Sequence, residues 1–162
     1  MRAVKAKLNF ESLITNRSLV SNKLPLSIAD VGHISIAVPS IEEAKLFYSK
    51  TFGCKSSDPI DIPAQGIRMI YLFFNNIKIE LMEPSNPSSP IQKFLDKNPA
   101  GGLHHICLTT NDAQTAKSKL LEDDIRILAA DKDAKGHHGR DIFFMHPKDA
   151  FGTLIEIEQT DN

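Results

Sequence analysis

The chain of 162 residues contains 41% hydrophobic and 24% charged residues, and its 19 basic and 20 acidic side chains leave a net charge of −1. This length suits one compact domain, or two small halves that share a core, and excludes a multidomain enzyme. The near-zero net charge provides no overall basic field for a nucleic acid, and no apolar run reaches the roughly 20 residues that cross a bilayer, so we expect neither partner. Cys54 and Cys107 are too few for a disulfide scaffold, which favours a reducing compartment.

Residues 1–27 differ in composition from the rest of the chain. Five lysine and arginine residues accompany a single acidic residue, Glu11, and several serines lie between them. This composition is typical of an organellar transit peptide, with a disordered tail as the alternative. A transit peptide would direct the protein to the mitochondrial matrix; without one we expect a cytoplasmic protein. The folded domain is expected to span residues 28–162.

The first part of this domain, at about residues 31–84, is predicted to contain a strand, a helix and two further strands. Apolar residues alternate with polar or small ones from His33 to Val38, which predicts a half-buried strand. Ser40 lies three residues before Glu43, the spacing of a capping box, and begins a helix that stops near Gly53. After a turn at Pro63–Gly66 we expect the strands Arg68–Phe74 and Ile77–Met82, with the tight turn Asn75–Asn76 between them.

A connector at residues 85–101 precedes a second run of similar elements at about residues 102–160. In the connector, the pair Ser89–Pro90 predicts the start of a short helix over Ile91–Lys97. The second run begins with a strand at His105–Thr110 and a helix from Ala113 to Leu121. The other expected segments are a short strand at Ile125–Leu128, a polar loop at Asp131–His138, and the strands Asp141–Met145 and Thr153–Glu158 on either side of a turn at Pro147–Gly152.

The two runs form an internal repeat. Each begins with a strand led by a histidine, His33 or His105, and ends with a strand that carries a glutamate, Glu80 or Glu156. The separations are 47 and 51 residues, and the order of the elements is the same in both runs. A repeat of about fifty residues therefore predicts a domain made of two equivalent modules.

Strand alternation predicts where these four side chains point. Isoleucines occupy one face of the first strand, so His33 lies on the other face, and the same argument applies to Glu80, His105 and Glu156. If the modules curl their sheets and join edge to edge, two imidazoles and two carboxylates line one cleft. Nitrogen and oxygen donors without a thiolate favour cobalt, manganese, nickel, iron or zinc. The alternative is that each of the four is an ordinary solvated or structural side chain.

Other histidines have weaker interpretations. His104 precedes the regular alternation of its strand and is a candidate for supporting a metal ligand from outside the metal shell. The pair His137–His138 in a glycine-flanked loop is expected to meet solvent or substrate. His146 and Lys148 lie in a predicted surface turn, where Lys148 would contact an anion only if the turn overhangs the cleft.

Several motifs in residues 31–159 resemble those of the methylmalonyl-CoA epimerase family, in the vicinal oxygen chelate (glyoxalase-like) superfamily. The motifs are Gly32-His-Ile-Ser-Ile-Ala-Val-Pro39, Pro63-Ala-Gln-Gly66, Ile79-Glu-Leu81, Ser89-Pro-Ile91, Gly101-Gly-Leu-His-His-Ile106, Phe144-Met-His-Pro-Lys148 and Leu154-Ile-Glu-Ile157. The resemblance implies an α+β fold of two paired βαβββ modules in a curved, cleft-bearing sheet, and a homodimer. It also implies a divalent metal held by His33, Glu80, His105 and Glu156, with cobalt as the expected ion and manganese, nickel or zinc as alternatives.

The implied activity is the interconversion of (R)- and (S)-methylmalonyl-CoA by transfer of the C2 proton through a metal-stabilised enolate. We expect Glu80 and Glu156 to be the acid–base pair, and His146 and Lys148 are the candidates for contacts with CoA. The chain departs from some relatives at Met69, where they carry a glutamate proposed as a base, and at Glu80, where the family often has glutamine. The alternatives are a lactoylglutathione lyase-type glyoxalase with nearly the same metal shell, a ring-cleaving dioxygenase with iron and one glutamate fewer, and a non-catalytic binding protein.

Overall fold

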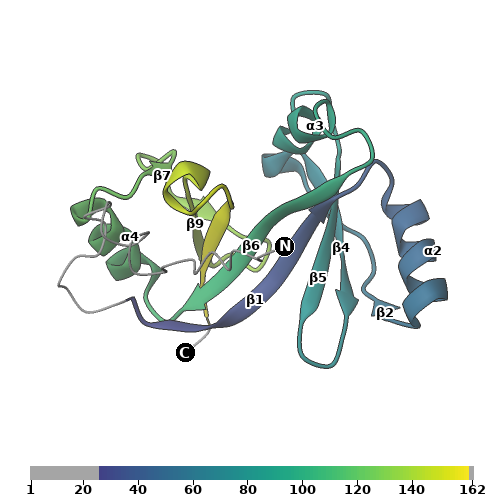
Figure 1. The fold of residues 1–162 in the computed structure, drawn as a ribbon, viewed down its shortest axis with the longest axis horizontal. Helices are drawn as coiled ribbons and strands as arrows, with labels where there is room; N and C mark the ends of the chain where they lie inside the picture. The colour runs from purple at the N-terminus through teal and green to yellow at the C-terminus, as the bar shows by residue number, and fades with distance from the viewer. Residues whose placement is uncertain (1–25, 161–162) are drawn as a thin grey trace, which may run out of the picture.

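The structure is a computed structural model that describes residues 26–160 (Figure 1). The described residues form one mixed sheet and three helices, which confirms the predicted α+β class. The elements in chain order are β1 (Ile28–Ala37), α2 (Ile41–Phe52), β2 (Lys55–Ser56), β3 (Ile60–Ile62), β4 (Ile67–Phe73), β5 (Lys78–Pro84), α3 (Pro90–Leu95), β6 (Gly102–Thr110), α4 (Ala113–Glu122), β7 (Ile127–Leu128), β8 (Ala134–Lys135), β9 (Asp141–Met145) and β10 (Ile155–Gln159). Nearly all of the predicted leader, residues 1–27, lies outside the described residues.

The two modules meet at the centre of the sheet through the antiparallel pair β1 and β6. The strand order is β2-β4-β5-β1-β6-β10-β9-β7, while β3 pairs with β4 and β8 with β9. In each module the first strand runs parallel to the last, as β1 with β5 and β6 with β10. The internal repeat of the sequence therefore corresponds to a structural repeat, and the modules join edge to edge.

The longest helix of each module covers the outer face of its own half of the sheet (Figure 1). The apolar residues beneath α2 include Ile70, Leu72 and Leu81, and α4 packs in the same way on module two. The first turn of α2 is capped as predicted, because Ser40 Oγ accepts a hydrogen bond from the Glu43 amide at 3.3 Å. These contacts leave the inner face of the sheet free for other side chains.

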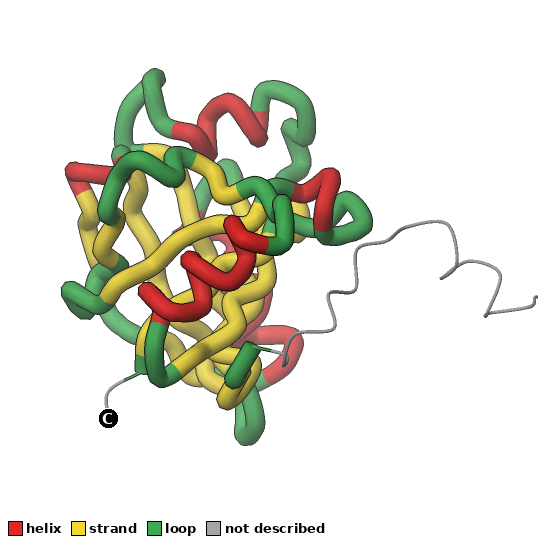
Figure 2. Tube along the Cα trace, turned by 90° about the vertical axis from the view of Figure 1, so that its left-hand side faces the viewer, coloured by secondary structure: helices red, strands yellow, loops and turns green. Residues whose placement is uncertain are grey.

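The inner face is more buried than the strand pattern indicated. In β1 the side chains of His33, Ser35 and Ala37 are 0–4% exposed, whereas Ile34 and Ile36 on the opposite face are only partly buried. Inner-face residues of β4 and β5 form their own apolar cluster, against which Ile91 and Leu95 of α3 pack. The polar face of the predicted half-buried strand is thus an interior surface, because the sheet curves around it (Figure 2).

Several predicted boundaries were wrong. The connector helix ends at Leu95 rather than Lys97, and the strand predicted from Ile125 begins only at Ile127, because Asp124 takes a left-handed backbone conformation with φ of 59° just before it. The predicted polar loop at Asp131–His138 contains the short strand β8, and the edge strands β2 and β3 were not predicted. No helix in the described residues is long and apolar enough to cross a membrane.

Candidate metal centre

The four predicted ligand side chains lie together on the inner face of the sheet, where the two modules join. The pairing of β1 with β5 places Ser35 opposite Glu80, and the pairing of β1 with β6 places Ser35 opposite His105. Glu156 comes from β10, the strand beside β6. The four central strands therefore each contribute one side chain to a single point, and each of the four side chains is only 4–6% exposed.

The donor atoms of these side chains are within contact distance of one another. His105 Nε2 lies 3.0 Å from Glu156 Oε2 and 3.9 Å from Glu80 Oε2. His33 Nε2 lies 3.2 Å from Glu156 Oε2 and 3.7 Å from Glu80 Oε2. Ligand atoms about 2.1 Å from one octahedral ion are separated by about 3 Å when adjacent and about 4 Å when opposite. The observed separations fall in this range, so the cluster has the dimensions of a shell around one ion.

Two further observations support a cation at this cluster. Both ring nitrogens of His33 are buried and make no hydrogen bond, although Nε2 faces the two carboxylates described above. A buried ring nitrogen without a hydrogen bond costs free energy unless another group satisfies it. Glu80 and Glu156 place two carboxylates in the interior, where unneutralised charge is costly. A divalent cation would bind one imidazole nitrogen of His33 and neutralise both carboxylates. The residues present therefore fit a divalent metal.

The carboxylate of Glu156 is held in its ionised form. Burial raises the pKa of Glu156, but hydrogen bonding to His105 and close contact with His33 outweigh burial and bring the pKa to about 2. Burial lowers the pKa of His33, yet the contact with Glu156 and the charge of Glu80 leave that pKa above its ordinary value. The lowered pKa of Glu156 and the raised pKa of His33 both mean that this cluster favours a positive charge beside its carboxylates.

Ser35 is a site residue that the sequence analysis did not identify. Its side chain is completely buried, and its hydroxyl donates a short hydrogen bond to Glu80 Oε2. The signal was present, because Ser35 is two residues from His33 on the same strand and therefore shares its face. Ser35 orients the Glu80 carboxylate toward the two histidines.

His104 supports His105 through a break in the strand pairing. Ser35 pairs with His105 and Ile36 pairs with Leu103, so β6 has one extra residue, His104, at a bulge. The two Nδ1 atoms of His104 and His105 lie 2.9 Å apart, and the His104 ring packs against Phe94 of α3. Burial and the neighbouring His105 lower the pKa of His104 to about 4, which keeps this ring neutral near pH 7.

Strand β8 and the loop after it reach from module two to module one on the inner face. Gln65 Nε2 donates to the carbonyl oxygen of Lys135 at 3.2 Å, and the Tyr71 hydroxyl lies 3.4 Å from His137 Nδ1. Tyr71 in turn packs edge-on against His33, with 6.0 Å between the ring centroids. His137 is therefore partly buried against an aromatic side chain that borders the metal cluster, and it is not simply a solvent-facing residue.

The other predicted contact residues lie in the turn between β9 and β10. His146 Nδ1 accepts a hydrogen bond from the Lys148 amide at 3.1 Å, while the Lys148 side chain is exposed. Nearby, Asp149 forms an ion pair with Arg126 at 2.6 Å, which ties the turn to the segment before β7. The turn is thus fixed in place, and the Lys148 ammonium is not part of the buried cluster.

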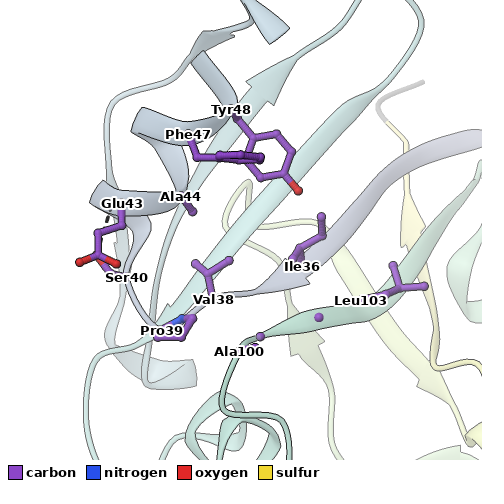
Figure 3. A pocket seen from close by; sticks show the side chains of 12 residues that line it. Ile36, Val38, Pro39, Ser40, Glu43, Ala44, Phe47, Tyr48, Ala100 and Leu103 are labelled. Atoms are coloured by element: carbon purple, nitrogen blue, oxygen red, sulfur yellow. Dashed lines mark hydrogen bonds between the residues drawn. The ribbon is translucent and has the colours of Figure 1, made fainter. Parts of the chain in front are cut away.

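A separate hollow lies on the outer side of the sheet, between α2 and the adjoining ends of β1 and β6 (Figure 3). Its volume is about 420 Å³, and Phe47, Tyr48 and Leu103 are among its lining residues. Phe47 and Leu103 are more than half exposed. None of the four predicted ligands lines this hollow, so it is distinct from the metal cluster.

Comparison with known proteins agrees with this architecture. The model of the Glyoxalase/Bleomycin resistance protein/Dioxygenase superfamily matches residues 32–144. An ethylmalonyl-CoA/methylmalonyl-CoA epimerase of Cereibacter sphaeroides is 42% identical over 132 residues, covering 82% of this chain and 98% of that protein. The mitochondrial methylmalonyl-CoA epimerase of Bos taurus is 38% identical, covering 82% of this chain and 75% of that protein.

A crystal structure of methylmalonyl-CoA epimerase from Mycobacterium tuberculosis superimposes with a TM-score of 0.77 at 29% identity, covering 87% of this chain and 95% of that one. Its likeness extends over both modules and the central strands that carry the buried cluster. Sequence and structure together show that this chain belongs to the methylmalonyl-CoA epimerase family of the glyoxalase superfamily.

Proposed function

We propose that this protein interconverts (R)- and (S)-methylmalonyl-CoA by moving the proton on C2 of the malonyl group. The observation that carries the proposal is the buried convergence of His33, Glu80, His105 and Glu156, with donor separations of 3.0–3.9 Å. The relatives named as epimerases of methylmalonyl-CoA support the choice of substrate.

The four converging side chains would hold one divalent ion. Cobalt is the ion we propose, with manganese, nickel or zinc as alternatives, because imidazole and carboxylate donors suit all four. When bound, the ion supplies a Lewis acid that offsets the negative charge developing on the thioester oxygen, an effect worth several kcal/mol. Ser35 and His104 contribute by fixing the orientation of Glu80 and His105.

Glu80 and Glu156 are the groups we propose for proton transfer. Inversion at C2 requires a base on one face of the substrate and an acid on the other, and these two glutamates come from strands on opposite sides of the β1–β6 pair. Their contacts with the histidines and with Ser35 all use Oε2, so Oε1 of each carboxylate is the oxygen we assign to the C2 proton. A positioned acid–base pair accelerates such a step about 10²–10⁴-fold.

Met69 has no part in this transfer. It is 1% exposed within the apolar cluster of the inner face, and its thioether cannot accept a proton at neutral pH. The family members that carry a glutamate at this position have a carboxylate there that this chain lacks. In this chain, the carboxylate of Glu80 is the available alternative.

Exchange of the C2 proton with deuterated water tests the assignment. We expect Glu80→Gln and Glu156→Gln each to slow exchange at C2 by about 10²-fold or more, while metal content is measured in parallel. Glu42→Gln, on the exposed surface of α2, is the matched control and should exchange at the wild-type rate. Wild-type exchange in both site variants would exclude this pair.

Substrate assays separate the proposed activity from the related ones. The protein should epimerise methylmalonyl-CoA and lose this activity when a chelator removes its metal. Turnover of the hemithioacetal of glutathione instead would indicate a lactoylglutathione lyase-type glyoxalase. Undiminished epimerisation after complete metal removal would contradict the mechanism proposed here.

We assign contacts with the CoA moiety to the turn that contains His146 and Lys148. The Lys148 ammonium is exposed and can therefore meet a phosphate, while the hydrogen bond from the Lys148 amide to His146 holds the turn. Lys148→Ala should raise KM for methylmalonyl-CoA and leave KM unchanged for a methylmalonyl thioester that lacks the nucleotide. Equal effects on both substrates would exclude this role.

The family membership also supports a homodimer and a mitochondrial location. Exposed apolar side chains such as Phe47, Phe52 and Leu103 on the outer side of the sheet are suited to contact with a second copy. Light scattering should therefore give about twice the mass of 18.0 kDa. Residues 1–27 fused to a fluorescent protein should direct it to mitochondria, and a cytoplasmic distribution would contradict a transit peptide.

A further inference from the structure

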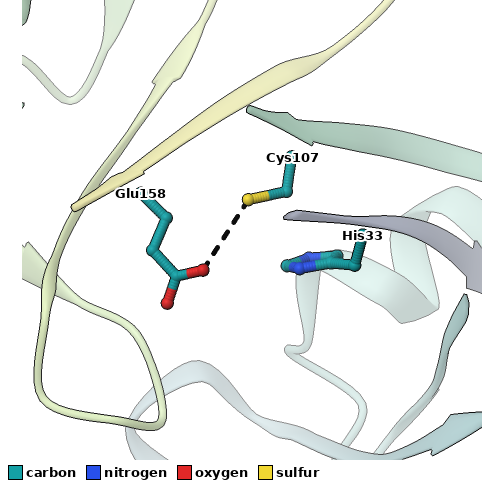
Figure 4. Close-up of side chains that lie close together, drawn as sticks. All are labelled: His33, Cys107 and Glu158. Atoms are coloured by element: carbon teal, nitrogen blue, oxygen red, sulfur yellow. Dashed lines mark hydrogen bonds between the residues drawn. The ribbon is translucent and has the colours of Figure 1, made fainter. Parts of the chain in front are cut away.

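A second group of potential metal ligands lies beside the first, on the same inner face of the sheet: His33, Cys107 and Glu158 (Figure 4). Cys107 is two residues after His105 on β6, and Glu158 is two residues after Glu156 on β10, so both share the face of the first cluster. One ligand atom of each of the three residues lies within 4.8 Å of the others.

The chemistry of this second cluster differs from that of the first because it contains a thiol. Cys107 is completely buried, and its Sγ lies 3.8 Å from Glu158 Oε2. Arg140 approaches the other oxygen, Oε1, at 3.9 Å, so Oε2 is the Glu158 oxygen turned toward the sulfur. His33 completes the group with ring nitrogens that are buried and have no hydrogen-bond partner.

We propose that His33, Cys107 and Glu158 form a second metal site, selective for a strongly thiophilic divalent cation such as Cd²⁺. Soft thiolate ligands select such ions, whereas the oxygen-rich first cluster suits harder ones. Binding forms a metal–sulfur bond and releases the thiol proton to solvent, with no change of oxidation state.

The two sites share His33 and therefore compete. An ion bound by Cys107 and Glu158 together with His33 removes one imidazole from the first cluster. We thus expect one tightly bound ion per chain, with the chemical softness of the ion deciding which set of ligands it uses. A thiophilic ion in the second site would inhibit proton transfer, because the first cluster would lack one of its four ligands.

Titration of the chelator-treated, full-length protein with Cd²⁺ tests the proposal directly. A cadmium–thiolate bond gives a charge-transfer absorption in the near ultraviolet that imidazole and carboxylate ligands do not produce. We expect this band in the wild-type protein and its loss in Cys107→Ser and His33→Ala. Glu158→Gln should keep the band with an affinity about tenfold lower.

Cys54→Ser is the matched control, because Cys54 packs on the outer face of module one, away from the cluster. It should keep the band at full intensity. Absence of the band in the wild-type protein at saturating Cd²⁺, or its persistence in Cys107→Ser, would overturn the site. A band unchanged in His33→Ala, or two tightly bound ions per chain, would overturn the sharing of His33. If Cys107→Ser does not fold, cadmium NMR of the wild-type protein decides, since only a sulfur ligand moves the signal strongly downfield.

Discussion

Replacement of Ser35 by alanine removes the hydrogen bond that joins β1 to the Glu80 carboxylate. The hydroxyl is completely buried and the carboxylate is 6% exposed, so neither group can exchange its partner for water. A hydrogen bond to a charged group is worth about 1.5–3 kcal/mol. This range corresponds to a factor of about 10 to 150 in an equilibrium constant. We therefore expect Ser35→Ala to weaken metal binding by about that factor.

The assay is a competition between the protein and a chelator of known affinity for Co²⁺, followed by C2 proton exchange with the ion held at saturation. Saturating metal should restore part of the exchange rate, because Ser35 orients a ligand and does not itself carry the proton. Metal affinity equal to that of the wild-type protein, or tighter, would refute the positioning role of Ser35.

Ser89→Ala is the matched control for this experiment. Ser89 is 1% exposed and accepts a hydrogen bond from the Ile91 amide at 3.2 Å, where it caps α3. Its replacement should lower the free energy of unfolding by about 1 kcal/mol, a typical cost for a lost helix cap. Because Ser89 has no contact with the cluster, metal affinity should stay unchanged, which separates loss of stability from loss of the site.

Two further predictions concern the backbone before β6 and the loop that crosses the inner face. Gly101→Ala should lower the free energy of unfolding more than Gly53→Ala. Both glycines have positive φ, but a Cβ at Gly101 would lie 2.5 Å from the Ala37 carbonyl oxygen, whereas a Cβ at Gly53 meets nothing within 4 Å. Equal losses of unfolding free energy in urea denaturation would contradict this reasoning. Burial and, to a smaller extent, nearby positive charge lower the pKa of His137 to about 4. Between pH 6.5 and pH 4 the unfolded chain therefore binds a proton at His137 that the folded protein does not bind. The free energy of unfolding should fall as the pH is lowered through this range. His137→Gln should reduce this fall. If the free energy of unfolding drops by the same amount between pH 7 and pH 5 in the wild-type protein and in the variant, His137 does not cause the fall.

The sequence by itself predicted the elements whose pattern is local. Alternation in β1, the Ser40 cap of α2 and the turn before β5 depend on neighbouring residues, and each appears in the structure near its predicted place. The same local period assigned His33 and His105 to the face opposite the isoleucines, since side chains of a strand alternate between faces. The repeat then related the two modules without any knowledge of their packing.

Shorter and more irregular features were not predicted. Strands of two or three residues, such as β2 and β8, contain too few positions for a period to emerge. The local pattern of β6 indicated a supporting role for His104, but the bulge that brings its ring to His105 arises only from the pairing of β6 with β1 and was not predicted. The role of Ser35 was missed because strand alternation places it on the face of His33 but does not give a partner for its hydroxyl. That partner, Glu80, is set only by the pairing of β1 with β5.

The tertiary structure alone decided how the two modules meet. The lateral order of the strands and the register of β1 against β6 depend on contacts between residues about seventy positions apart, which no local period encodes. The sequence therefore determined which side chains could face a cleft, because that choice depends on neighbours along one strand. Only the packing of four separate strands decided that these side chains lie within contact distance and away from water, and that Cys107 and Glu158 lie beside them.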